Sequence, residues 1–392
     1  MRWRVSLRAA GLVVVLAAAV QLHAGVMYTV TDLGTLGGTY SYARGINDRG
    51  QVVGWSETGG DYAQHAFRTG PNQPINPATD DLGSLVGSRS RAFAVNNLGQ
   101  VVGWSGEANE FRAFRTGPNQ PINPATDDLG TLGGSMTFAY GINDVGQVVG
   151  ESWLSGNKSA RAFRTGPNQP INPSTDNLGT LGGSSSTASA INDAGQVVGA
   201  SPGRGFRTGP NSAINPLTDD LGTLGGLGST ANAITASGHV AGASSLAPEQ
   251  PGFPGAAHVY RTGRNLRINP ASDDLGAIGE GSPMVWGMND GGDIVGSYFA
   301  GPDYDHESAF VVLESTIYEL NDLIDPASGW TLDGAYDINN LGQIVGSGHF
   351  GGQPRAFRLD PIPEPGSLSV VAIWLLVCAR SRSVTRAVGR LR

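Results

Sequence analysis

The residue types that most often catalyse reactions are few in this chain and widely spaced. Its six histidines form no His-Glu-X-X-His pair, and there is no phosphate-binding Gly-X-X-X-X-Gly-Lys loop. One Gly-X-Ser-X-Gly run lies at 199–203. A nucleophile elbow, however, uses the backbone N–H of the residue after its serine, and Pro202 has none. In a chain with 59 glycines we interpret this run as a chance match.

Acidic residues come closer to a catalytic pattern. Pairs recur at Asp80-Asp81, Asp127-Asp128, Asp219-Asp220 and Asp273-Asp274. Paired carboxylates can perform acid/base chemistry, but pairs that begin successive outer strands would be spread around a perimeter, so we predict that they cap turns. An Asp-Tyr-Asp-His-Glu insert at 303–307 offers oxygen ligands for a hard cation but lacks the spacing of a calcium loop. The sequence thus predicts no catalytic residue, metal or cofactor, and a protein that is not an enzyme.

A repeated sequence pattern predicts the secondary-structure elements that carry these residues. A segment of small and aliphatic residues ends in asparagine, and a tight turn, Gln-Val-Val-Gly, Ala-Phe-Arg and Asp-Leu-Gly follow it. The repeated position falls at Asn47, Asn96, Asn143, Asn192, Thr235, Asn289 and Asn339, at intervals of 43 to 54 residues. A period near 49 is typical of a four-stranded propeller blade.

The segments have the composition of β-strands. Val148-Val149 and Ala162-Phe163 are short and rich in β-branched or aromatic residues. Loops such as Asn143-Asp144-Val145-Gly146 suit hairpins, because Asn and Asp bond locally and Gly accepts a positive φ. No body segment shows a sustained 3.6-residue period, so we expect little helix.

The two ends of the repeat region complement each other. The region begins with an Asp-Leu-Gly strand at 28–34 and ends with the Ala-Phe-Arg strand at 356–358 that normally precedes it. We therefore predict an all-β, seven-bladed propeller over 26–360, in which the N-terminal strand completes the last blade and hides its edge. Small residues such as Ala94 and Gly141 favour the asparagine-ending strand as the innermost one. Six blades with an odd flank is a weaker alternative.

A variable slot lies three residues before each repeated position. It holds Arg44, Phe93, Tyr140, Ser189, Asn232, Trp286 and Tyr336. Varying one position on a repeated inner strand can specialise a ring for a ligand, and aromatic faces suit sugars. Tyr140, Trp286 and Tyr336 are therefore the candidate ligand-binding residues. The alternative is that the slot simply packs between blades.

The repeat resembles the HAF family of extracellular repeats. The resemblance is clearest at Asp32–Gly38, Gly45–Gly54 and His65–Arg68, and it covers residues 28–359. The motif's histidine survives only at His65 and His258, so we expect no shared chemical role for it. The resemblance implies export and a β-rich fold, and it implies no reaction.

The N-terminus has the order of a secretory signal peptide. Three arginines precede an apolar run at 9–20 that is too short to span a membrane, and small residues follow. We expect a signal peptide at 1–24 that is cleaved after Ala24. The alternative is a buried strand.

The C-terminal segment, 361–392, resembles a PEP-CTERM sorting tail. Pro363, Glu364 and Pro365 precede an apolar run at 368–379 and five arginines. The resemblance implies that an exosortase-type membrane enzyme reads these three residues while a short apolar helix inserts transiently in the membrane. The run is shorter than the ~20 residues of a spanning helix, and snorkelling arginines would have to extend it. The alternative is a fraying amphipathic tail.

Charge and composition limit the partners. The formal net charge of −8 includes eight arginines at the two ends, so the body is more acidic still, which argues against nucleic-acid binding. The single cysteine, Cys378, permits no intrachain disulfide. We expect an exported protein of the cell surface or extracellular matrix with a binding or structural role. Polysaccharide is the leading partner, and a propeller hydrolase or lyase acting on extracellular polysaccharide is the alternative.

Overall fold

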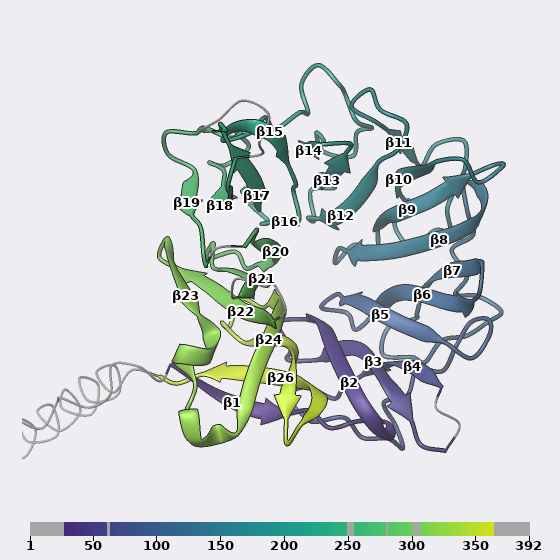
Figure 1. Ribbon diagram of the computed structural model, residues 1–392. Coiled ribbons are helices and arrows are strands. Elements are labelled where there is room, and N and C mark those ends of the chain that lie inside the picture. The colour runs from purple at the N-terminus through teal and green to yellow at the C-terminus, as the bar shows by residue number, and fades with distance from the viewer. Residues whose placement is uncertain (1–26, 61–62, 249–254, 280, 301–305, 364–392) are drawn as a thin grey trace, which may run out of the picture.

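The computed structural model describes residues 27–60, 63–248, 255–279, 281–300 and 306–363 as strands arranged around a central axis (Figure 1). The predicted signal peptide and its cleavage site at Ala24 lie outside these residues, as do Glu364, Pro365 and the apolar run at 368–379. In the described part, the helical elements are two short 3-10 turns, η1 (Leu320–Leu323) and η2 (Pro326–Ser328). The described chain is a β-propeller.

The strands form four concentric sets. The strands nearest the axis are β2 (Gly37–Ile46), β5 (Ser90–Val95), β8 (Gly133–Ile142), β12 (Thr187–Ile191), β16 (Ala233–Ile234), β20 (Met284–Met288) and β24 (Trp330–Ile338). The second set is β3 (Val52–Thr58), β6 (Val101–Glu107), β9 (Val148–Leu154), β13 (Val197–Ser201), β17 (Val240–Leu246), β21 (Ile294–Ala300) and β25 (Ile344–Phe350). The third is β4 (Gln64–Arg68), β7 (Glu110–Arg115), β10 (Ala160–Arg164), β14 (Arg204–Arg207), β18 (Ala257–Arg261), β22 (His306–Leu313) and β26 (Gln353–Pro361). Outer strands are β1 (Tyr28–Asp32), β11 (Asn177–Gly179), β19 (Asp274–Gly276) and β23 (Thr316–Glu319), while β15 (Gly225–Ser229) pairs with β17 just before β16.

The hydrophobic core lies between neighbouring repeats. In one cluster Val53 and Ala66 of one repeat pack against Val101 and Phe114 of the next. Phe114 is fully buried, as are the equivalent aromatic residues of the other third strands. Each repeat therefore buries its apolar face only when its neighbour is present, which couples the stability of all of them.

The two ends of the repeat region meet as the split repeat predicts. Strand β1 pairs antiparallel with β26, with Tyr28 opposite Pro361 and Asp32 opposite Phe357. The resulting sheet has the order β1-β26-β25-β24, so the N-terminal strand is outermost and the small-residue strand innermost. The predicted pairing of the terminal strands is confirmed.

The predicted seven-bladed architecture needs correction. Backbone pairing divides the described strands into six sheets of three to seven strands, not seven equivalent four-stranded blades. A bridge between Phe111 and Met136 joins β7 to β8 and merges two repeats into one sheet. Several Asp-Leu-Gly segments contribute only an isolated bridge, such as Phe67 with Asp81. The Asp81 side chain accepts from Gly83 N and so caps the turn that follows this bridge.

The prediction of a C-terminal apolar helix as part of the fold is also corrected. Within the described ranges, no helix is long and apolar enough to cross a membrane. The stretch on which the prediction rested lies outside those ranges.

Candidate functional site

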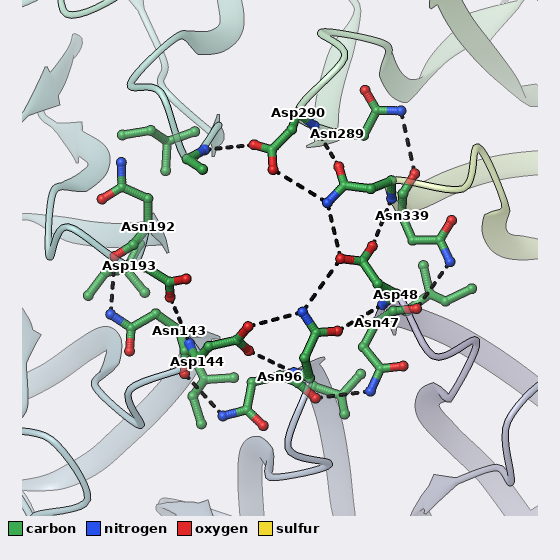
Figure 2. Close-up of a pocket in the computed structure, with 18 of the residues that line it drawn as sticks. Asn47, Asp48, Asn96, Asn143, Asp144, Asn192, Asp193, Asn289, Asp290 and Asn339 are labelled. Carbon is green, nitrogen blue, oxygen red and sulfur yellow. Dashed lines mark hydrogen bonds between the residues drawn. The ribbon is translucent and has the colours of Figure 1, made fainter.

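The loops that follow the inner strands form one end of a central channel. Asparagine, aspartate and aliphatic residues of successive repeats line this end, which encloses about 210 Å³ (Figure 2). In each typical loop the asparagine donates to the glutamine four residues on and to the backbone carbonyl of the next repeat, as Asn96 does to Gln100 and Asn143. These buried amides fix the order of the repeats around the axis. We call this end the amide mouth.

A bulge in the inner strands turns the slot residues toward the channel. Tyr140 has no partner in the register between β8 and β9, because the pairing shifts between Ala139 and Gly141. The same shift occurs at Arg44, Phe93, Ser189, Trp286 and Tyr336. A bulge leaves one residue unpaired and re-aims its side chain. The alternation of side chains along a regular strand does not predict this bulge.

The bulge accounts for the glycine of the Gln-Val-Val-Gly motif. A Cβ on Gly150 would lie 1.9 Å from the backbone oxygen of Phe138, where the bulged strand crosses it. Gly54 and Gly103 face the same close approach. Only glycine fits such an approach of two backbones. Gly242 of the Asn232 repeat meets the same close approach, at 2.0 Å from Thr230 O, so the glycine is required throughout the ring.

All of the slot residues line one cavity at the other end of the channel. Its walls are Arg44, Phe93, Tyr140, Thr187, Ser189, Asn232, Trp286 and Tyr336, and it encloses about 320 Å³. The section between the two ends, lined by residues such as Gly141, Ala190 and Asp337, shares lining residues with both of them. Every wall residue is half-buried. We call this space the slot cavity.

Aromatic rings form two walls of the slot cavity. Trp286 and Tyr336 lie side by side, with ring centroids 5.8 Å apart and an edge-on angle of 65°. Phe93 and Tyr140 make a second edge-on pair at 5.6 Å. The three predicted ligand-binding residues therefore share one cavity, two of them in direct contact. Half-buried rings in an open cavity can stack on a ligand, which a purely inter-repeat packing role does not require.

A carboxylate lies beside the Tyr140 wall. The Tyr140 hydroxyl donates to Glu151 Oε1 at 3.2 Å, and the Thr187 hydroxyl donates to Glu151 Oε2 at 2.6 Å. Burial, followed by the charge of Glu151, raises the pKa of Tyr140, so its phenol stays neutral and remains a donor. Sequence reasoning missed Glu151. Its signal is that Trp55 and Trp104 occupy the equivalent position after Val-Val-Gly.

Arg44 is the cationic wall of the slot cavity. Its guanidinium carbon lies 3.9 Å from the centroid of the Tyr336 ring and 5.4 Å from that of Trp286. Burial lowers the pKa of this guanidinium from its usual value, while neighbouring Tyr336 and Glu307 oppose that effect. The side chain nevertheless remains charged at neutral pH, as arginines do in proteins.

The other sequence candidates are structural. The Asp80 carboxylate accepts from Asn76 N, and the Asp81 carboxylate accepts from Gly83 N. Asp127, Asp219 and Asp273 make the same bond as Asp80 in their own repeats. The prediction that the paired aspartates cap turns is confirmed. Ser201 of the Gly-X-Ser-X-Gly run is buried and bonds to the backbone of Leu181 and Ser185. Pro363 is exposed at the end of the described chain.

In four repeats the residue in the histidine slot contacts the aspartate of the outer segment. His65 Nδ1 lies 2.9 Å from Asp81, and His258 Nδ1 lies 2.8 Å from Asp274. Arg112 and Arg204 replace the histidine and pair with the equivalent aspartates, Asp128 and Asp220. Where Asn177 replaces the aspartate, Arg161 bonds instead to the backbone oxygen of Ser184. These contacts join the third strand to its outer segment and are structural.

Comparisons with known proteins give distant structural similarity alone. No family model matches the chain, and no curated protein matches its sequence. A Mycobacterium tuberculosis puromycin-hydrolyzing peptidase matches 80% of this chain and 50% of its own, at 14% identity and a TM-score of 0.43. Trypanosoma rangeli sialidase matches 92% of this chain and 58% of its own, at 10% identity and a TM-score of 0.35. The chain thus spans between half and three fifths of the solved chains it resembles.

The prediction that the protein is not an enzyme is corrected. The solved structures with a similar strand arrangement include a peptidase and sialidases. At this level of similarity no activity or substrate is transferred to this chain. The slot cavity also brings Arg44 and Tyr140 into one lining, and Glu151 is hydrogen-bonded to Tyr140 beside it.

Proposed function

We propose that the protein is exported to the cell surface or extracellular matrix and binds polysaccharide in the slot cavity. The observation that carries the proposal is the convergence of all the slot residues on one cavity with two aromatic walls. Aromatic rings bind the apolar C–H faces of sugars, and the polar Ser189 and Asn232 supply a hydroxyl and an amide for sugar hydroxyls. A cavity of about 320 Å³ lies at the lower end of the range of ligand sites.

A glycan-binding screen of the purified protein tests the proposal. We expect binding of at least one extracellular polysaccharide, and we expect its loss in a Trp286→Ala, Tyr336→Ala double variant. Phe350→Ala is the matched control, because Phe350 is an exposed ring stacked on Trp330 away from the cavity. Equal binding by the double variant and the wild type would exclude the slot cavity as the site.

The sorting proposal rests on the resemblance of the C-terminal segment to PEP-CTERM tails. An exosortase-type enzyme would read Pro363, Glu364 and Pro365, and the HAF-like repeats would form the exported body. Glu364→Ala should leave the melting temperature unchanged, because the motif follows β26, the last strand of the described fold. In a host that has an exosortase, fractionation and mass measurement should show altered processing. Identical mass and location of the variant would argue against sorting.

A hydrolase or lyase acting on extracellular polysaccharide is the second candidate. Glu151 favours it, since this carboxylate is oriented by Tyr140 and Thr187 beside the cavity and carboxylates serve as acids and bases in such reactions. Release of new chain ends from a bound polysaccharide, lost in Glu151→Gln, would support catalysis. Binding without chain cleavage would leave the protein a binding module.

A further inference from the structure

The order of the repeats places unlike residues on opposite sides of the slot cavity. Hydrogen bonds between the amide loops run from Asn47 through Asn96, Asn143 and Asn192 to Thr235, and from Asn289 through Asn339 back to Asn47. In this order Arg44 stands opposite Ser189 and Asn232. The pairs Phe93–Tyr140 and Trp286–Tyr336 fill the two arcs between them. The cavity therefore has a cationic side, two aromatic walls and a neutral polar side.

The half-buried Arg44 side chain has no protein acceptor for its guanidinium among the described residues. Its Nε is buried without a hydrogen-bond partner, and no hydrogen bond or ion pair to this side chain occurs among the described residues. By contrast, the buried Arg358 makes three hydrogen bonds to the Asp360 carboxylate. Leaving a cation without acceptors is costly. The rings of Tyr336, Trp286 and Trp55 offset part of that cost through cation–π contacts.

A carboxylate ligand would supply the missing acceptors. Guanidinium presents donors in a planar fork that matches a carboxylate in two parallel charge-assisted bonds. Two acids near the cavity are already engaged, since Glu151 is held by Tyr140 and Thr187 and Asp337 accepts from two backbone N–H groups. A third, Glu307, is close enough to raise the pKa of the Arg44 guanidinium, but no hydrogen bond or ion pair joins the two side chains among the described residues. The aromatic walls would flank a flat sugar ring, and Ser189 and Asn232 would meet its hydroxyls on the far side.

We propose that the slot cavity selects a carboxylate-bearing sugar unit and that Arg44 binds its carboxylate. This inference rests on the proposed polysaccharide-binding function and adds the chemical class of the ligand. It assigns to Arg44 a role that its place in the repeat does not predict, because the other slot residues are uncharged.

Calorimetric titration with matched glycans tests the inference. The probes are oligogalacturonate, the same oligosaccharide with its carboxyl groups reduced, and dextran sulfate. Wild-type protein should bind oligogalacturonate at least about tenfold more tightly than the reduced form, as expected for charge-assisted bonds. Arg44→Gln should lose this preference and retain the weaker binding of the reduced form. Arg44→Lys, which keeps the charge but not the fork, should restore only part of it.

Each other outcome overturns a defined part of the argument. Equal affinity of the wild type for the acidic and reduced forms would exclude the carboxylate role and leave polysaccharide binding standing. Tighter binding of dextran sulfate than of oligogalacturonate would replace carboxylate by sulfate. Binding of none of the three would reject the proposed function together with the inference. Thermal melts of both Arg44 variants show whether a loss of binding comes from misfolding.

Discussion

The Asn339 side chain donates a 3.0 Å hydrogen bond from Nδ2 to the backbone oxygen of Asn47, 292 residues away in the sequence. Bonds of the same kind link the neighbouring loops, so this one joins the last repeat to the first (Figure 2). The pairing of β1 with β26 closes the same junction at the outer edge. The ring is therefore held at both its inner and outer circumference.

Asn339→Asp should weaken this junction. Aspartate keeps the oxygen that accepts from Leu341 and Gln343, but it cannot donate to Asn47 O or Gln343 Oε1. Two buried acceptors would lose their donor, so we expect the free energy of unfolding to fall by roughly 2–4 kcal/mol. Urea denaturation measures it. Asn177→Asp is the control, because this exposed residue uses only its acceptor oxygen, toward Gly179. A similar loss in both variants would contradict the account.

The series of hydrogen bonds between the asparagine loops is interrupted at Thr235. Restoring an asparagine there should stabilise the protein. Thr235 has no amide to donate, and His239 occupies the glutamine position four residues on. Installing the typical pair as Thr235→Asn with His239→Gln should raise the free energy of unfolding by about 1 kcal/mol, through a new bond toward Asn289. Thr235→Asn alone should gain less, because its amide would lack the glutamine acceptor. A double variant less stable than the wild type would show that this junction has adapted to threonine.

Asp337 should make stability depend on pH. Burial raises its pKa from 3.8 to about 7, although Ile46 N and Ile338 N donate to the carboxylate. Between about pH 4 and pH 7 the folded protein holds a proton that the unfolded chain has lost, so the free energy of unfolding falls as pH rises through this window. The loss is roughly 4 kcal/mol at most, and it is complete above about pH 7.

Asp337→Asn isolates this effect from other titrating groups. The variant should unfold at higher urea concentration than the wild type at pH 8, and the difference should shrink or reverse at pH 4. Parallel stability profiles for the two proteins would show that Asp337 does not titrate in this range.

Trp286→Ala should affect binding more than stability. Its ring is half-buried in the slot cavity and its Nε1 donates to Ser297 Oγ at 3.0 Å, so we expect a loss of about 1–2 kcal/mol from area and hydrogen bonding. Tyr260→Ala, at a fully buried aromatic position, should cost about 3–5 kcal/mol. Thermal melts compare them. Equal destabilisation would make Trp286 a core residue and remove it from the binding site.

Arg44→Met should leave the free energy of unfolding unchanged or higher. The substitution keeps an apolar stem against the rings and removes a cation without hydrogen-bond acceptors. Arg358→Met, which removes three hydrogen bonds to the partly exposed Asp360 carboxylate, should instead cost about 2 kcal/mol. A large loss of unfolding free energy in Arg44→Met would mean that the Arg44 cation stabilises the fold through its cation–π contacts. It would count against a role for Arg44 in ligand binding.

Local features of the strands and turns could be predicted from the sequence. The Asn-Asp-X-Gly loops form tight turns, with Gly146 at a φ of 81°, because the chemistry of these turns lies within four consecutive residues. The complementary ends predicted the pairing of β1 with β26, since a strand missing at one terminus was present at the other. Repetition also fixed which residues share a position in every repeat.

The tertiary structure alone decided how those positions face one another. The bulge at Tyr140 depends on the register between two strands, and a period of two along one strand cannot show it. The grouping of strands into six sheets depends on single bridges such as Phe111 with Met136, which no local pattern marks. Arg44 faces Asn232 only because the chain closes into a ring. Tyr140 meets Glu151 across the β8–β9 pair, through a register that the sequence pattern does not show. The sequence determined which side chains the ring displays, and closure determined which of them share a cavity.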